Sequence, residues 1–246
     1  MERNMHFEIA GLNDIVVRLA WAQLEIFADD VEKIQVMAAG DEATVSDLRI
    51  GIRESELLIE QPQYGLSLNL TESRWLQVCV RVPRTWEKAM HISTISGSLS
   101  ARGLQGREIV LDTVSGDVRA VRVHAEKLSL KTISGDMRAE KPDAKAVSVR
   151  SVSGDVAMDE MNAETLKCNS VSGRQRYHLV KGFERIDINA VSGDVVITST
   201  VTRMNVVMRS ISGQVRTEGV SVTEEAGVPM VRATGISADL KLISIQ

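Results

Sequence analysis

Apolar and polar side chains alternate at period two along most of this chain. Short runs of this alternation occupy residues 15–19, 34–36, 48–52, 57–59, 66–70 and 78–82. Successive side chains of a β-strand point to opposite faces, so this period indicates half-buried strands. Pro83 ends the last run, because proline has no N–H to donate to a sheet. No long helical pattern occurs, and the sequence therefore predicts an all-β protein.

A tetrapeptide ending in Ser-Gly recurs seven times between residues 94 and 213. Its copies are 94–97, 113–116, 132–135, 151–154, 170–173, 190–193 and 210–213, so that successive glycines are 19 or 20 residues apart. A unit of this length cannot bury its own apolar face, and copies must therefore stack. We predict a single-stranded parallel β-solenoid (β-helix) of about 19–20 residues per rung, in which each rung pairs with the next one along the chain.

Positions counted from each glycine predict which side chains face the core. Around Gly135, apolar residues stand seven and five positions before it (Leu128 and Leu130) and two positions after it (Met137). The apolar residues stand at odd distances before the glycine and at even distances after it. Since side chains alternate faces along a strand, this change requires a turn or bulge at the glycine. By the same count we expect the Thr or Ser three positions before the glycine and the Ser directly before it to face inward.

One apolar column has the opposite parity and should point outward. The residue two positions before each glycine is always Ile or Val: Ile95, Val114, Ile133, Val152, Val171, Val191 and Ile211. A continuous exposed apolar column is typical of a contact surface. The alternative is that these side chains pack along their own column and are partly covered by the segments that connect one rung to the next. We take the seven residues, termed the interaction stripe, as the candidate site.

The repeat divides the chain into two regions. Residues 1–88 are interpreted as a diverged N-terminal β-strand region or cap, and residues 89–246 as the regular solenoid. Val17, Val36, Leu57 and Val78 are spaced by 19 to 21 residues, which suggests diverged turns of the same repeat. A decayed C-terminal rung is visible in residues 234–240.

The composition of the chain argues against some classes of function but does not identify one. A formal net charge of −4 does not suggest nucleic-acid binding. No apolar run is long enough to span a membrane, and residues 1–6 do not resemble a secretory signal, so a cytoplasmic protein is expected. Cys79 and Cys168 do not form a disulfide framework, and Cys168 occupies an inward position that predicts a buried free thiol.

A column of serines precedes the glycines and could in principle supply a nucleophile: Ser96, Ser115, Ser134, Ser153, Ser172, Ser192 and Ser212. A serine nucleophile needs a base within hydrogen-bond reach, whereas the four histidines occupy unrelated repeat positions. A stack of hydroxyl groups that fills a tight corner is the better interpretation. We therefore assign no catalytic residue.

A column of aspartates follows the glycines at Asp117, Asp136, Asp155 and Asp194. Stacked carboxylates could hold Ca²⁺, but Ser98, Arg174 and Gln214 interrupt this column. Arg119 and Arg138 lie on the same outward face, so a solvated turn with salt bridges is expected instead. Phosphate-loop, dinucleotide and zinc spacings are absent, so no cofactor and no metal ligand are assigned.

The recurring (T/S)-(I/V)-S-G-D-(V/M), preceded by residues 78–83 as Val-Cys-Val-Arg-Val-Pro, resembles the bacterial putative-adhesin family, a domain of unknown function. The resemblance covers roughly residues 15–245 and is specific in residues 78–216. It implies a β-solenoid with repeated S-G-D turns and carries over no catalytic residue. It would also allow a location at the cell surface.

These observations together favour a non-enzymatic structural or protein-binding module. Its partner would be another protein or a further copy of the chain, which makes it a homo-oligomer in the second case. The alternative is an extracellular carbohydrate-binding or adhesion domain that takes a glycan. A glycan-active enzyme is the third hypothesis.

Overall fold

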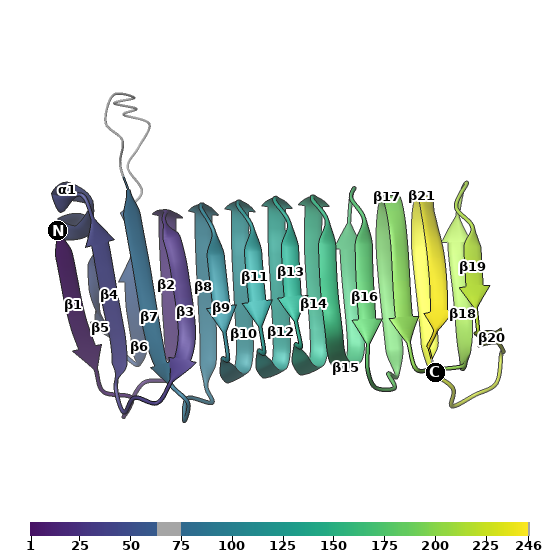
Figure 1. Ribbon diagram of the computed structural model, residues 1–246, viewed down its shortest axis with the longest axis horizontal. Helices are drawn as coiled ribbons and strands as arrows, with labels where there is room; N and C mark the ends of the chain where they lie inside the picture. The colour runs from purple at the N-terminus through teal and green to yellow at the C-terminus, as the bar shows by residue number, and fades with distance from the viewer. Residues whose placement is uncertain (63–74, 246) are drawn as a thin grey trace.

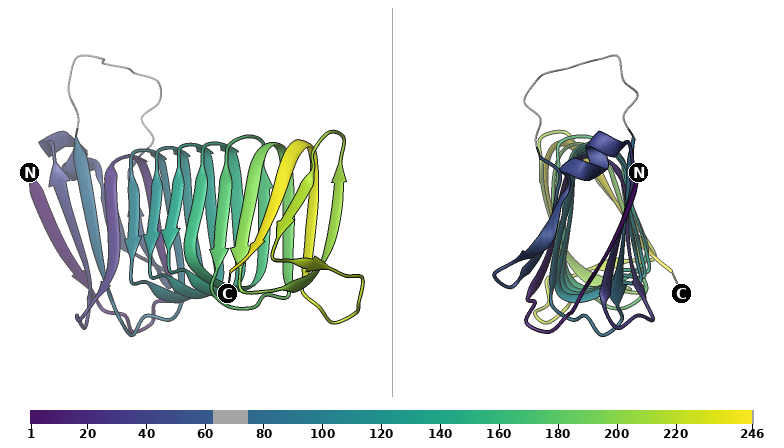
Figure 2. Two further views of the ribbon diagram at one scale, coloured as in Figure 1. Left: turned by 45° about the vertical axis from the view of Figure 1, so that its right-hand side comes forward. Right: turned by 90° about the vertical axis from the view of Figure 1, so that its left-hand side faces the viewer.

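The computed structural model describes residues 1–62 and 75–245 and shows an all-β protein with one short helix. Strands stack side by side into one long sheet, which gives the molecule the elongated shape of a ladder (Figure 1). Seen from its end, the stack has two long walls joined at their ends (Figure 2). The alternation at residues 66–70 lies outside the described residues.

The chain forms its strands in three groups. The N-terminal group is β1 (Glu2–Phe7), β2 (Asp14–Trp21), β3 (Gln23–Asp29), β4 (Ile34–Gly40), α1 (Glu42–Asp47), β5 (Arg49–Arg53), β6 (Glu56–Glu60) and β7 (Leu76–Pro83). The central group is β8 (Ala89–Ser96), β9 (Leu99–Arg102), β10 (Gln105–Ser115), β11 (Val118–Val121), β12 (His124–Ser134), β13 (Met137–Glu140), β14 (Asp143–Ser153), β15 (Val156–Ser170), β16 (Gln175–Leu179) and β17 (Arg185–Ser199). The C-terminal group is β18 (Arg203–Ser210), β19 (Val215–Glu218), β20 (Ser221–Val222) and β21 (Met230–Ser244).

The central group has the predicted register. Ile109 of β10 lies opposite Met90 of β8 on one side and opposite Leu128 of β12 on the other, and both pairings are parallel. Equivalent residues of successive repeats therefore stack in columns, and the inward columns are almost completely buried, as Ile109 and Leu128 show at 0% and 1% exposure. The fold is solenoid-like, and the expected parallel pairing of successive rungs is confirmed for this part of the chain.

At the N-terminal end the order of the rungs differs from the order of the chain. Val17 of β2 lies opposite both Ile59 of β6 and Ile92 of β8, so the first rung is inserted between two later ones. The strands beyond it are antiparallel: β1 pairs with β4, β4 with β7, and β5 with β6. Val36 pairs with Val80 in this antiparallel part. The prediction that Val36 belongs to the same parallel repeat as Val17 is therefore wrong.

The C-terminal end shows the same kind of insertion. Ala233 of β21 lies opposite Ile188 of β17 on one side and Met208 of β18 on the other. The decayed rung therefore separates the sixth glycine copy from the seventh, which ends the stack (Figure 1). The prediction that every rung pairs with the next one in sequence is wrong here, because parallel pairing requires matching register but not consecutive order.

The corner at each glycine explains the repeat. Gly135 has a φ of 136°, and a Cβ atom there would collide with the carbonyl oxygen of Gly116 in the neighbouring rung. Thr132 is 4% exposed and faces inward as predicted. Ser134 is exposed, and the prediction that the serine column faces inward is wrong, because the consecutive residues Ile133 and Ser134 are both exposed and the alternation of faces ends before the glycine.

Candidate binding surfaces

Every residue of the interaction stripe has an exposed side chain. Six of them are 41–51% exposed, and Ile211, on the terminal rung, is 83% exposed. The register of β21 places Ile236 between Val191 and Ile211, so Ile236 continues the stripe through the inserted strand and is 52% exposed. The structure thus has an apolar line that crosses the wall of the ladder from β8 to β18.

A shallow groove of about 530 Å³ runs beside the C-terminal half of the stripe. One side is formed by stripe residues, among them Val152 and Val171, together with Ile236. The facing side is formed by the residues four positions before the corner glycines, such as Asn169 and Asn189. Arg150 is the one charged residue among those that line it, so the groove is apolar with an amide rim.

The C-terminal serines of the column bond to the backbone of the stripe. Ser172 Oγ donates a hydrogen bond of 3.3 Å to the carbonyl oxygen of Val152, and Ser192 Oγ donates one of 3.2 Å to that of Val171. Each hydroxyl therefore links its own corner to the neighbouring rung. At these two corners, and at Ser212, whose Oγ donates to the carbonyl oxygen of Ile236, such a bond takes the place of the expected stacking of hydroxyl groups.

The aspartate column bridges successive corners in a similar way. Asp117 Oδ1 accepts a hydrogen bond of 2.9 Å from the backbone N–H of Asp136, and Asp136 Oδ1 accepts one of 3.0 Å from that of Asp155. The next bond in the column runs from the N–H of Arg174 to Asp155 Oδ1. This N–H, followed by the guanidinium of Arg174, lowers the pKa of Asp155. Within residues 1–62 and 75–245 no group of His, Cys, Asp and Glu is arranged to hold a metal ion.

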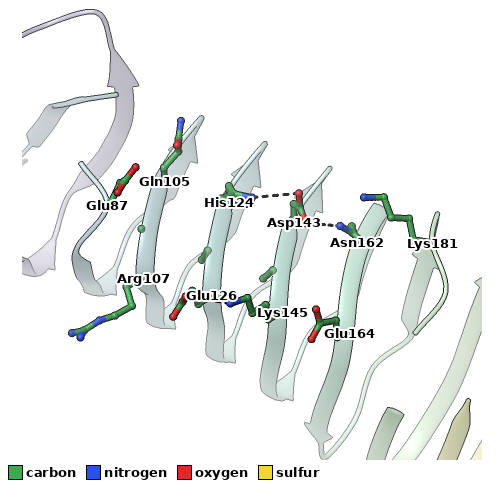
Figure 3. Close-up of a pocket in the computed structure, with 13 residues that line it drawn as sticks. Glu87, Gln105, Arg107, His124, Glu126, Asp143, Lys145, Asn162, Glu164 and Lys181 are labelled. Carbon is green, nitrogen blue, oxygen red and sulfur yellow. Dashed lines mark hydrogen bonds and ion pairs between the residues drawn. The ribbon is translucent and has the colours of Figure 1, made fainter. Parts of the chain in front are cut away.

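A second groove, of about 720 Å³, lies at the N-terminal ends of β10, β12 and β14 and at the equivalent segment of β15 (Figure 3). Its floor consists of small residues nine positions after the corner glycines: Gly106, Ala125 and Ala144. Two polar rows border the floor, Gln105, His124, Asp143 and Asn162 on one side and Arg107, Glu126, Lys145 and Glu164 on the other (Figure 3). We term this surface the polar groove.

Asp143 is central to the first row of the polar groove. Its carboxylate accepts a hydrogen bond of 2.6 Å from Asn162 Nδ2 and lies 3.3 Å from His124 Nδ1. In the second row, Lys145 Nζ lies 3.3 Å from Glu126 Oε1. These side chains are largely exposed, so the pairs add little stability, and their donors and acceptors are accessible to a ligand.

Sequence reasoning missed the polar groove although the signal was present. A small residue nine positions after the glycine, with polar residues on either side of it, recurs in consecutive repeats. Counting forward from Gly97, Gly116 and Gly135 locates this triplet in the same way that counting backward located the stripe.

Cys168 is a buried free thiol, as predicted. It contacts two polar side chains of the same rung across the core. Its Sγ donates to Gln175 Oε1 at 2.8 Å, and Tyr177 OH lies 2.9 Å from Sγ. Burial raises the pKa of Cys168 to about 12, so the thiolate is scarcely formed near neutral pH.

No helix in the described part of the chain is long and apolar enough to cross a membrane. The cytoplasmic location expected from residues 1–6 stays a prediction.

Comparison with known proteins gives a match to one family model and to several solved structures. The family model is that of Toastrack DUF4097, and it matches residues 12–241. No curated protein matches the chain. A putative adhesin from Bacteroides fragilis is 12% identical with a TM-score of 0.60, over 100% of this chain and 97% of that one.

Two structures from Parabacteroides distasonis are similar to a comparable degree. One is a putative adhesin, 12% identical with a TM-score of 0.53, over 98% of this chain and 97% of the other. The second is a putative lipid binding protein, 12% identical with a TM-score of 0.52, over 98% and 96% of the two chains. At this identity the likeness shows the fold.

Proposed function

This chain belongs to the Toastrack DUF4097 family, and we propose that it is a non-catalytic, adhesin-like protein-binding module whose interaction stripe is the contact surface. The observation that carries the proposal is the exposure of a β-branched apolar side chain on every rung from β8 to β18. Two proteins that share the fold bear the name adhesin, which supports this choice. Continuous apolar surface of this kind is costly to leave in water.

The spacing of the stripe suits an amphipathic helix of the partner protein. Stacked rungs repeat at about 4.8 Å, and one turn of an α-helix rises about 5.4 Å. A helix that lies along the stripe would therefore present about one apolar side chain to each rung over several turns. The amide rim of Asn169 and Asn189 beside the apolar line favours an uncharged helix face at the contact.

The hydrogen bonds of the reactive groups support the non-catalytic part of the proposal. Ser172 and Ser192 use their hydroxyl groups to bond main-chain carbonyls, and Asp117 and Asp136 use their carboxylates to bond main-chain N–H groups. Cys168 is buried with a raised pKa. The named serine and aspartate side chains thus bond successive rungs together, and the Cys168 thiol is held within the core.

The test uses a labelled amphipathic peptide of about twenty residues with leucine on one face, whose length of about 30 Å matches six rung steps. We expect saturable binding by fluorescence anisotropy, weakened at least about ten-fold by Val152→Lys with Val171→Lys. The matched control is Ala157→Lys with Val196→Lys, which adds the same charge to the other wall and should leave the affinity unchanged. Equal loss in both variants would overturn the proposal, as would the absence of binding.

Light scattering on the same variants separates a partner helix from a second copy of the chain. We expect Val152→Lys with Val171→Lys to leave the molar mass unchanged. A fall in mass would show that the stripe holds copies of this chain together, which contradicts the helix partner.

A second candidate function, carbohydrate binding, is favoured by the polar groove. Closely spaced amide, carboxylate and ammonium groups above a floor of small residues could hydrogen-bond the hydroxyl groups of a glycan chain. Asp143→Ala with Lys145→Ala would remove a carboxylate and an ammonium group from the two exposed rows and should abolish binding on a glycan array without changing peptide binding at the stripe. Unchanged glycan binding would contradict this site, and release of shortened sugars would reveal an enzyme instead.

A further inference from the structure

The terminal rung, formed by β18 and β19, exposes positions that every central rung buries. Val215 of β19 is 36% exposed, whereas Val195, its counterpart in β17, is 2% exposed. Val206 and Met208 of β18 are half-buried, whereas their counterparts Ile186 and Ile188 are 0% and 2% exposed. The apolar core of the ladder is therefore open at this end.

The backbone of the terminal rung is open at the same place. Both β18 and β19 pair with β21 on one side. On the other side, the one pairing within the described residues is that of Arg203 and Met204 with the short β20. Residues 205–210 and 215–218 thus present unpaired strand edges on the two walls, at the end of the ladder beyond β21 (Figure 2).

At the other end of the ladder the apolar core is covered. Ile34 and Val36 of β4 and Val45 of α1 are each 0% exposed, and the outermost strand β1 pairs with β4. The two ends therefore differ in how far their core residues are exposed. The half-buried residues of the outermost strand β1 are Arg3, Met5 and Phe7, so this end is a poorer match for the open apolar core than a second terminal rung.

We propose that two copies of this chain join end to end through their terminal rungs, about a two-fold axis perpendicular to the ladder. This inference goes beyond the proposed function and does not involve the interaction stripe. A single added strand would cover one wall, whereas a second terminal rung offers two open edges at the same separation. A two-fold axis that passes through both walls reverses strand direction, so β18 pairs antiparallel with β18 of the partner subunit, and β19 with β19.

Two features set the pairing register of this contact: the edge positions that β20 already occupies, and the need for inward residues to meet inward residues. Because β20 occupies the edge at Arg203 and Met204, β18 is free to pair about Met208, which places Val206 across from Ser210. Inward residues then meet inward residues. On the other wall, pairing about Thr217 places Arg216 across from the partner subunit's Glu218, an opposite-charge pair that occurs twice by symmetry.

A single two-fold axis allows both β18 and β19 to pair with their copies in the partner subunit. Cys168 and Tyr177 occupy, in an inner rung, the positions that Met208 and Thr217 occupy in the terminal rung, counted from the corner glycines. The Cys168 Sγ and Tyr177 OH atoms lie 2.9 Å apart, which shows that these two positions face each other across the core. An axis through Met208 therefore also passes close to Thr217, and the contact closes at two copies without forming a filament.

The molar mass of the full chain, measured by light scattering across a wide concentration range, tests the proposal. We expect a dimer, seen by electron microscopy as a rod twice as long as the single ladder. Met208→Lys with Thr217→Lys places like charges together at the axis and should give a monomer, whereas Val152→Lys with Val171→Lys should leave the dimer intact. A monomer at all concentrations, or longer filaments, would overturn the proposal.

Charge exchange tests the register even if the lysine variant fails to fold. Arg216→Glu and Glu218→Arg should each weaken the dimer at least about ten-fold, because two like-charge pairs replace two opposite-charge pairs. The two substitutions together should restore the dimer. Failure of either single variant to weaken it, or of the pair to restore it, contradicts the proposed contact.

Discussion

Asp155 and Arg174, equivalent residues of neighbouring rungs, are joined by three hydrogen bonds. Asp155 Oδ1 accepts from the backbone N–H of Arg174 at 2.9 Å, and Oδ2 accepts from the guanidinium nitrogens Nε and Nη2 at 3.2 and 2.9 Å. The backbone bond repeats the one that other aspartates of the column make. The guanidinium contacts are added here because the column changes from aspartate to arginine.

This contact predicts a pH dependence of stability. The pKa of Asp155 is lowered in the folded protein, so the unfolded state takes up a proton first as the pH falls. The stabilisation is present above the unfolded pKa of about 3.9 and is lost as the pH falls through the folded pKa. We expect Asp155→Asn to melt lower than wild type at pH 7 and to show a smaller difference near pH 3, measured by circular dichroism. The same difference at both pH values would contradict this account.

The corner predicts a large difference between two adjacent substitutions. Gly135→Val should cost more than about 3 kcal/mol, because a side chain there meets the Gly116 carbonyl and the positive φ disfavours a β-branched residue. Asp136→Asn should cost less than about 1 kcal/mol, because the amide retains an oxygen that accepts the N–H of Asp155. Urea denaturation of the two variants measures the difference, and two equal, small losses would refute the corner assignment.

The inserted position of β21 predicts an unusual pattern of hydrogen exchange. Amides of β21 lie between β17 and β18, so we expect their protection to approach that of β17 and to exceed that of β18. In a ladder stacked in chain order, β21 would be the terminal strand and would exchange first. Exchange followed by mass spectrometry on peptides of the three strands distinguishes these orders.

The buried thiol predicts selective labelling. Cys168 is fully buried with a pKa of about 12, whereas Cys79 is half-buried. At pH 8 we expect an alkylating reagent to modify Cys79 first and to modify Cys168 at least about a hundred-fold more slowly than in denaturant. Peptide mapping reads out both sites. Rapid native labelling of Cys168 would show that the core around Tyr177 opens readily.

Much of the central ladder can be predicted from the sequence, because equivalent positions of each repeat specify which residues form the buried columns. Leu128, Leu130 and Met137 are buried as the count from Gly135 predicts. The position of the serine column does not follow from the sequence, because counting by parity assumes one reversal at the glycine, whereas Ile133 and Ser134 are both exposed before it. The polar groove is harder to predict, because the residue nine positions after Gly97, Gly116 and Gly135 is small but its polar neighbours differ in type from one repeat to the next.

The sequence by itself determined the rung length, the corner glycines, the inward columns and the composition of the outward stripe. These are local properties, since about twenty residues suffice to specify each of them. The tertiary structure alone decided the order of the rungs. Parallel pairing needs matched register and buried apolar faces, and β2 and β21 meet both conditions between rungs that are not their neighbours in the chain. Because β21 lies inside the stack, Ile236 becomes part of the stripe, and the rung of β18 and β19 is left at the end with open edges.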